Sequence, residues 1–66
     1  MQTEKYRGYT LWGHAILQPA QFAGSGTVTR DTKVVGVSGV LGSFDTDEEA
    51  ELVGLSWCRA WVDGHG

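Results

Sequence analysis

Apolar residues recur at strand spacing through the first two thirds of the chain and at helical spacing in the last third. Residues 22–30 alternate strictly, with Phe22 and Val28 on one face beside two glycines and mainly serine and threonine on the other. This alternation predicts a strand whose outer face is polar.

Two further strands are predicted on either side of it. Residues 6–17 are rich in aromatic and aliphatic side chains, which suit a half-buried strand surface. Residues 33–44 carry β-branched valines among glycines, and this pattern predicts a strand with a bulge or kink near Gly39. Turn residues at 18–21 and 30–33 separate the three segments.

The last third of the chain predicts a helix. Thr46 and Glu49 have the spacing of a capping box, and acidic residues fill the first turn, where the helix dipole favours negative charge. We expect the helix to begin at or just after Thr46, to run to about Val62, and to end with Gly64 as a left-handed cap.

One stripe of this helix is predicted to lie on the sheet. Glycines at strand positions 24, 26 and 36 could leave room there for two indole rings. The stripe residues recur at helical spacing and are Ala50, Val53, Gly54, Trp57 and Trp61. We therefore expect one α+β domain over residues 1–66 with the order β-β-β-α, in which a three-stranded antiparallel meander carries a C-terminal helix.

Length and composition narrow the class of protein. A chain of 66 residues holds one hydrophobic core, and its single cysteine excludes an internal disulfide, so self-association is the remaining aid to stability. The 41% content of hydrophobic residues excludes a disordered tail, and a net charge of −3 disfavours binding to nucleic acid through phosphates. The first residues lack a secretory signal and no segment is apolar enough for a membrane span, which predicts a cytoplasmic protein.

The reactive residues and their spacing in the sequence predict no enzyme, metal site or cofactor. Neither His14 nor His65 has a nearby carboxylate or cysteine in the sequence that would mark a metal site or an acid/base pair. Cys58 falls near the C-terminal end of the helix, where a thiol is not activated, and we expect it to be a small buried residue. Helix capping accounts for most of the acidic run at residues 45–51.

Two surfaces remain as candidates for binding. A sheet face with Tyr9, Trp12 and His14 could stack the bases of a single-stranded nucleic acid, with basic residues such as Arg30 and Lys33 beside it. On the helix, the tryptophan stripe leaves three apolar residues to the side or rear, which we expect at a protein interface or as ordinary exposed residues: Leu52, Leu55 and Val62.

A motif at the start of the helix carries a family resemblance. Residues 42–50 read Gly-Ser-Phe-Asp-Thr-Asp-Glu-Glu-Ala, and the helix ends Ala-Trp-Val-Asp at 60–63. The segment resembles that of a group of short, uncharacterised bacterial β-β-β-α proteins, which implies no function. It is similar, more loosely, to the β-β-β-α portion of HicB-type antitoxins, which implies a toxin as partner, although the DNA-binding portion of many such antitoxins is absent here.

These observations favour a non-enzymatic protein-interaction module, either a homodimer or a binder of another protein. A domain that binds single-stranded nucleic acid through strand aromatics is the alternative.

Overall fold

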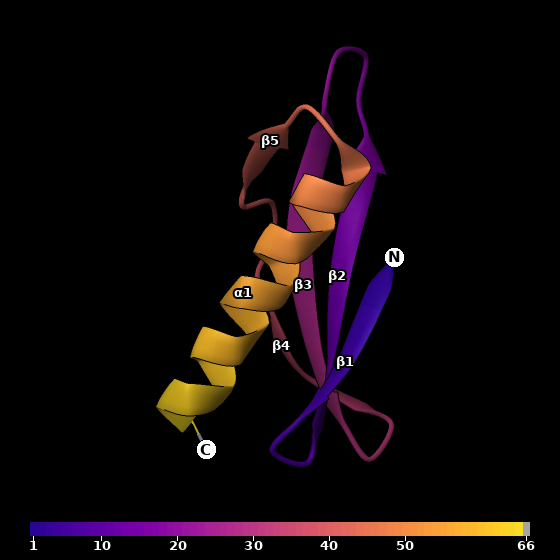
Figure 1. Cartoon of the computed structure of the whole chain (residues 1–66). Helices are drawn as coiled ribbons and strands as arrows, with labels where there is room; N and C mark the ends of the chain where they lie inside the picture. Colours follow the sequence, from indigo (N-terminus) through magenta and orange to yellow (C-terminus); the bar gives the residue numbers. More distant parts are fainter. Residues whose placement is uncertain (66) are drawn as a thin grey trace.

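The computed structural model describes residues 1–65, which form an antiparallel sheet with one helix across one of its faces (Figure 1). The first four strands follow one another across the sheet as a meander, and the short fifth strand pairs with the start of the third. This arrangement confirms the predicted α+β class, the meander and the C-terminal helix, with four main strands and a fifth in place of three. The elements are β1 (Gln2–Tyr6), β2 (Tyr9–Leu17), β3 (Phe22–Arg30), β4 (Lys33–Val37), β5 (Gly42–Phe44) and α1 (Asp47–His65).

A tight turn separates β1 from β2, so the prediction of one strand over residues 6–17 is wrong at its start. Arg7 and Gly8 have φ angles of 51° and 85°, as expected of the two central residues in a type I′ hairpin turn. Asp31 and Thr32 repeat this feature between β3 and β4, with φ angles of 51° and 67°. Both turns lie at the same end of the sheet (Figure 1).

The third predicted strand is divided into β4 and β5, and the break falls at the predicted glycine. Gly39 has a φ angle of 71°, which directs the chain out of the strand. The connecting residues still follow β3, because the Ser38 amide donates to the Gly26 carbonyl at 2.9 Å and the Leu41 amide donates to the Gly24 carbonyl at 2.8 Å. This side of β3 is therefore hydrogen-bonded along most of its length.

Helix α1 begins at the predicted cap. Thr46 Oγ1 accepts a hydrogen bond from the Glu49 amide at 3.1 Å, which satisfies a donor that has no partner in the first turn. The predicted end is wrong, because the helix includes Gly64 and continues to His65. The His65 ring stacks on Trp61, and its Nδ1 lies 2.8 Å from the Trp61 carbonyl oxygen, so this side chain supports the last turn.

The core lies between α1 and the central strands β2 and β3. Its buried cluster is made of Leu11, Val28, Leu55, Cys58 and Val62. The buried stripe of α1 is therefore rotated from the predicted one.

The two tryptophans of the predicted stripe do not lie at its centre. Trp57 and Trp61 are partly buried at the margin of the core, and only Trp61 meets one of the three glycines named from the sequence. A Cβ on Gly36 would lie 2.8 Å from the Trp61 ring, so the expected pairing of glycine with indole is confirmed there. At Gly24 and Gly26 the helix backbone takes the place expected for an indole, because a Cβ at either would lie within 2.7 Å of a helix carbonyl oxygen.

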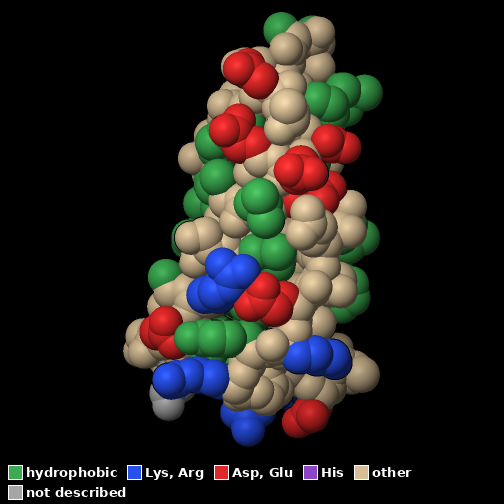
Figure 2. Space-filling model, in the orientation of Figure 1, with side chains coloured by type: hydrophobic (Ala, Val, Ile, Leu, Met, Phe, Trp, Pro, Cys, Tyr) green, Lys and Arg blue, Asp and Glu red, His purple; other side chains and the backbone are tan. Residues whose placement is uncertain are grey.

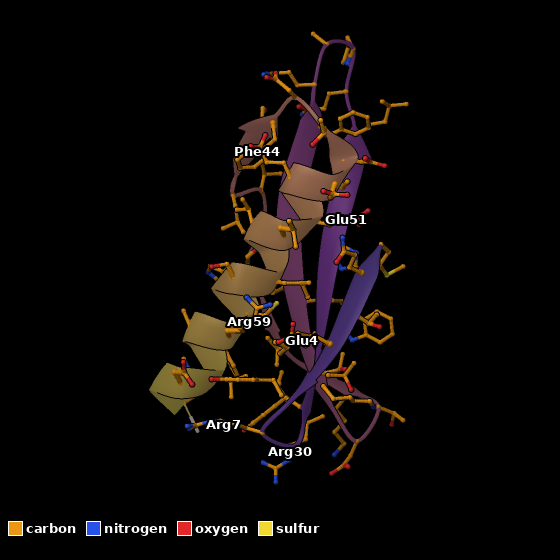
Figure 3. All side chains as sticks on the ribbon, viewed as in Figure 1. Glu4, Arg7, Arg30, Phe44, Glu51 and Arg59 are labelled. Carbon is orange, nitrogen blue, oxygen red and sulfur yellow. The ribbon has the colours of Figure 1, made fainter. Side chains whose placement is uncertain are left out.

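Two side-chain contacts tie the edge strand β1 to α1. Arg59 extends from the helix toward Glu4 (Figure 3), and its Nε and Nη2 atoms donate to the two carboxylate oxygens at 2.8 and 2.7 Å. The Tyr6 hydroxyl donates to Asp63 Oδ1 at 2.8 Å. The hydrogen bonds that Glu4 accepts from Arg59 lower the pKa of Glu4. The hydrogen bond that Tyr6 donates to Asp63 raises the pKa of Tyr6.

Candidate functional site

The sheet face opposite α1 is covered by no second layer within residues 1–65 (Figure 1). Side chains alternate along a strand, so Trp12 and Thr27 point away from the helix because Leu11 and Val28 point toward it. We call this surface the open sheet face. Its exposed or half-buried strand residues are Thr3, Lys5, Thr10, Trp12, His14, Ile16, Ser25, Thr27, Thr29, Val34, Val37 and Ser43.

Two aromatic rings of β2 form hydrogen bonds with threonine side chains of β3 on this face. Trp12 Nε1 donates to Thr29 Oγ1 at 2.9 Å, and His14 Nε2 lies 3.0 Å from Thr27 Oγ1. Because these ring nitrogens have partners inside the chain, the surface that the rings offer to a binding partner is mainly apolar.

Exposed aliphatic side chains extend the apolar surface to both sides of the rings. Val34 and Val37 are 63% and 62% exposed, and the strand register places Val37 beside Thr27, which in turn pairs with Trp12. Ile16, on the same strand as Trp12, is 48% exposed. Apolar side chains of β2 and β4 thus lie on either side of the serine and threonine residues that β3 presents on this face. Several exposed apolar side chains on one face mark an interaction site more often than single scattered ones do.

Charge is distributed unevenly between the two faces of the sheet. No strand position of the open sheet face carries a carboxylate, and Lys5 is the one charged residue among those named. Its Nζ donates to Thr10 Oγ1 at 3.0 Å. A partner could therefore cover this face without leaving a carboxylate buried and unpaired.

The structure separates the three residues predicted to bind nucleic acid. Trp12 and His14 share the open sheet face, but Tyr9 lies on the opposite side, because it is three positions from Trp12 and five from His14 along the strand, and side chains alternate between the faces. The Tyr9 ring makes an edge contact with Trp61 at a centroid distance of 6.0 Å, and the Arg30 guanidinium lies 5.1 Å from its centroid. The expectation of a single aromatic face with Tyr9, Trp12 and His14 is wrong.

The interface predicted on the helix flank is also corrected. Leu55 is 3% exposed and Val62 is fully buried, so both belong to the core between α1 and the sheet. Only Leu52 lies at the surface, with 48% of its area exposed. The rotation of the buried stripe explains the error, since it brings into the core residues that the predicted stripe had left outside.

The single cysteine lies in the core between α1 and the sheet. The thiol of Cys58 is buried within bonding distance of the carbonyls of Thr27 and Trp12, at 3.4 and 3.8 Å, and burial raises its pKa. Among residues 1–65 no three His, Cys, Asp or Glu side chains gather as metal ligands, and no pocket opens on the surface that they form. No helix in the same range is long and apolar enough to cross a membrane.

Fold and site together define a small α+β domain in which one helix covers one face of an antiparallel meander and the other face is free. Comparison with family models, with curated proteins and with solved structures gives no match to this chain. The resemblance to HicB-type antitoxins and to short bacterial proteins stays a prediction from the motif at residues 42–50.

Proposed function

We propose that the chain is a non-enzymatic interaction module that forms a homodimer through the open sheet face. The observation that supports this function is that half-buried Trp12 and exposed Val34 and Val37 lie together on one sheet face without a carboxylate among its strand residues. A chain of this size gains little stability from one core, and a second copy would bury the face that the helix leaves uncovered.

The size of the face suits a dimer. The chain measures 36 × 20 × 16 Å, so a rectangle around its broad face encloses roughly 700 Å², and contact over most of that face would approach the about 800 Å² that each partner contributes to a standard interface. Two such sheets would pack about 10 Å apart, as the two layers of a β-sandwich do.

The composition of the face also suits contact with its own copy. In a two-fold dimer each partner presents the same patch, so a face that carries several charges of one sign repels itself. Here threonine, serine, valine and two rings dominate, and the single cation Lys5 lies on the edge strand β1, where it can stay in contact with water.

Sedimentation of the wild type and of two variants over a range of micromolar concentrations tests this function. Val37→Glu places a charge on the β4 side of the proposed contact, opposite Thr27 of β3, and we expect a monomer with an unchanged circular dichroism spectrum, because Val37 contributes little to the core. Leu52→Glu places the same charge on the exposed side of α1 and should dimerise as the wild type does.

The outcomes separate the candidate surfaces. A dimer that persists in Val37→Glu but dissociates in Leu52→Glu would move the interface to the helix. A monomeric wild type would contradict the homodimer. If that monomer bound a mixed pool of single-stranded oligonucleotides with an affinity that falls steeply with salt and is lost in Trp12→Ala, the open sheet face would be a nucleic-acid surface instead.

A further inference from the structure

His14 is the one strand residue of the open sheet face, within residues 1–65, whose charge changes near neutral pH. It lies on β2, an inner strand of the sheet, so contact between two open sheet faces covers it whichever way the second copy is turned. An imidazole takes up a proton between about pH 8 and 5, whereas a lysine keeps its charge throughout that range. The proposed contact therefore encloses two groups, one from each copy, whose charge depends on pH.

The hydrogen bond of the His14 ring is available in both protonation states. Its Nε2 lies 3.0 Å from Thr27 Oγ1, and a hydroxyl can donate to a neutral ring or accept from a protonated one. The side chain is half-buried in the single chain, so water still reaches it there. Protonation should therefore leave the fold of each copy unchanged and act on the contact between the copies.

The neighbours of His14 on its own face offer no negative charge. On β1, the Met1 amine lies 2.8 Å from Glu51 Oε2 and is thus turned toward the helix, and the charged side chain of the face, Lys5, is itself a cation. The register places Lys5 beside Thr10, four residues along β2 from His14. The other neighbours on β2 and β3 are uncharged: Trp12, Ile16, Ser25 and Thr27.

The carboxylates of the helix lie on the other side of the sheet. Figure 2 views the molecule from the side of α1 and shows acidic side chains gathered over the start of the helix, where Asp47, Glu48 and Glu49 form its first turn. The edge strand β4 adds only apolar side chains to the open sheet face, those of Val34 and Val37. The second copy presents the same face, so it brings another imidazole and another lysine without a strand carboxylate.

We infer that acid dissociates the homodimer, because a proton taken up by His14 of either copy places an unpaired charge in the contact. The inference rests on the proposed homodimer and adds its regulation. A charged ring enclosed by apolar side chains, hydroxyls and cations loses its hydration and gains no counter-ion. The dimer is therefore tightest above the pH range in which imidazoles titrate. It weakens as the pH falls through that range, since the separate chains bind protons that the dimer excludes.

The presence of two rings in each dimer makes the dependence on pH steep. If the contact admits only neutral rings, two protonated chains must release two protons to form one dimer. The dissociation constant then rises by up to about 100-fold for each unit of pH once the separate chains are fully protonated. Between pH 7.5 and 5.5, a range in which imidazoles pass from mostly neutral to mostly protonated, we expect a rise of at least about tenfold.

Sedimentation of the wild type and of two variants at pH 7.5 and 5.5 tests this regulation. The dissociation constant of the wild type should rise at the lower pH. That of His14→Gln should be the same at both values, because an amide can bond to Thr27 but takes up no proton. His65 lies on α1, stacked on Trp61 on the other side of the sheet, so His65→Gln is the matched control and should follow the wild type. Carboxylates titrate mainly below this range and contribute little to the change.

Proton NMR of the imidazole rings gives a second measurement, which holds even where His14→Gln fails to dimerise, because that variant still identifies the His14 signal. Protonation and dimerisation oppose each other, so the ring should take up its proton at a lower pH in a concentrated sample than in a dilute one. A midpoint that does not move with concentration, or a pH dependence of dimerisation that persists in His14→Gln, would overturn the regulation and leave the homodimer standing. A wild type that is monomeric at both pH values would overturn the proposed function itself.

Discussion

Gly54 of α1 lies directly against Gly13 of β2. A Cβ on Gly54 would lie 3.2 Å from the Gly13 Cα, and a Cβ on Gly13 would lie 3.0 Å from the Leu55 Cγ. The Gly54 position also overlaps the carbonyl oxygen of Ser25 on the next strand. Helix and sheet therefore meet through backbone atoms at this crossing, and the approach is closer than any side chain would allow.

Gly54→Ala should destabilise the fold, although alanine is the better helix former. The substitution gains up to about 1 kcal/mol of helix propensity, but the overlap with strand backbone forces the helix away and should cost more than that gain, with a net loss of about 1 to 3 kcal/mol. Gly64→Ala is the matched control, because no atom lies within 4 Å of its Cβ position, and it should stabilise the fold by about 0.5 to 1 kcal/mol. Urea denaturation of both variants measures the difference. Equal stabilisation by both would show that the helix does not contact the sheet at Gly54.

Leu55→Ala should have a much larger effect on stability than Leu52→Ala. Leu55 is 3% exposed in the core cluster, so its truncation leaves a cavity and should cost about 2 to 5 kcal/mol. Leu52 is 48% exposed, and its truncation should change the free energy of unfolding by about 0.5 kcal/mol or less. Thermal denaturation of the two variants compares them directly. Similar losses would contradict the rotation of the buried helix stripe.

The sequence predicts those elements whose patterns are local. The alternation at residues 22–30 and the cap at Thr46 each depend on short-range chemistry, and both agree with the structure. The turn at Arg7 was missed because arginine is uncommon at positive φ, and only the following glycine signals a hairpin there.

The candidate site was less accessible to sequence analysis. The direction of the buried helix stripe depends on where glycines of β2 and β3 let the helix approach, and that relationship joins residues distant in the chain. Once the stripe is rotated, Leu55 and Val62 enter the core and the uncovered apolar surface moves to the sheet. The alternation along β2, which puts Trp12, His14 and Ile16 on one face, was the signal that the sequence offered. Val34 and Val37 join that face only through the pairing of β4 with β3, which in turn pairs with β2.

Thr32→Gly should stabilise the chain. Thr32 has a φ angle of 67°, which a β-branched residue adopts only at a cost, whereas Asp-Gly is a preferred pair in a type I′ turn. We expect a net gain of about 1 kcal/mol in the free energy of unfolding. Relief of the left-handed strain stabilises the folded chain, and the larger conformational entropy of glycine in the unfolded chain offsets part of that gain. Gly8→Ala is the opposite change at the other hairpin, where φ is 85°, and it should destabilise. Chemical denaturation measures both, and a loss of stability in Thr32→Gly would contradict the turn geometry.

The ion pair between Glu4 and Arg59 should make stability depend on pH in the acidic range. The two hydrogen bonds from the guanidinium lower the pKa of Glu4 in the folded chain below its ordinary value of about 4.3. Between these two pKa values the unfolded chain binds more protons than the folded chain, so the free energy of unfolding rises with pH there. The contribution is fully present above the ordinary pKa and is lost as the pH falls through the folded pKa.

Denaturation of the wild type and of Glu4→Gln at a series of pH values measures this contribution. The variant should be less stable than the wild type at neutral pH, and the difference should shrink as the pH is lowered, because protonation removes the same charge from the wild type. The Arg59→Gln background is the control: without the guanidinium, Glu4→Gln should have little effect at any pH. Wild-type and Glu4→Gln curves that run parallel into the acidic range would show that the ion pair does not connect β1 to α1 in solution.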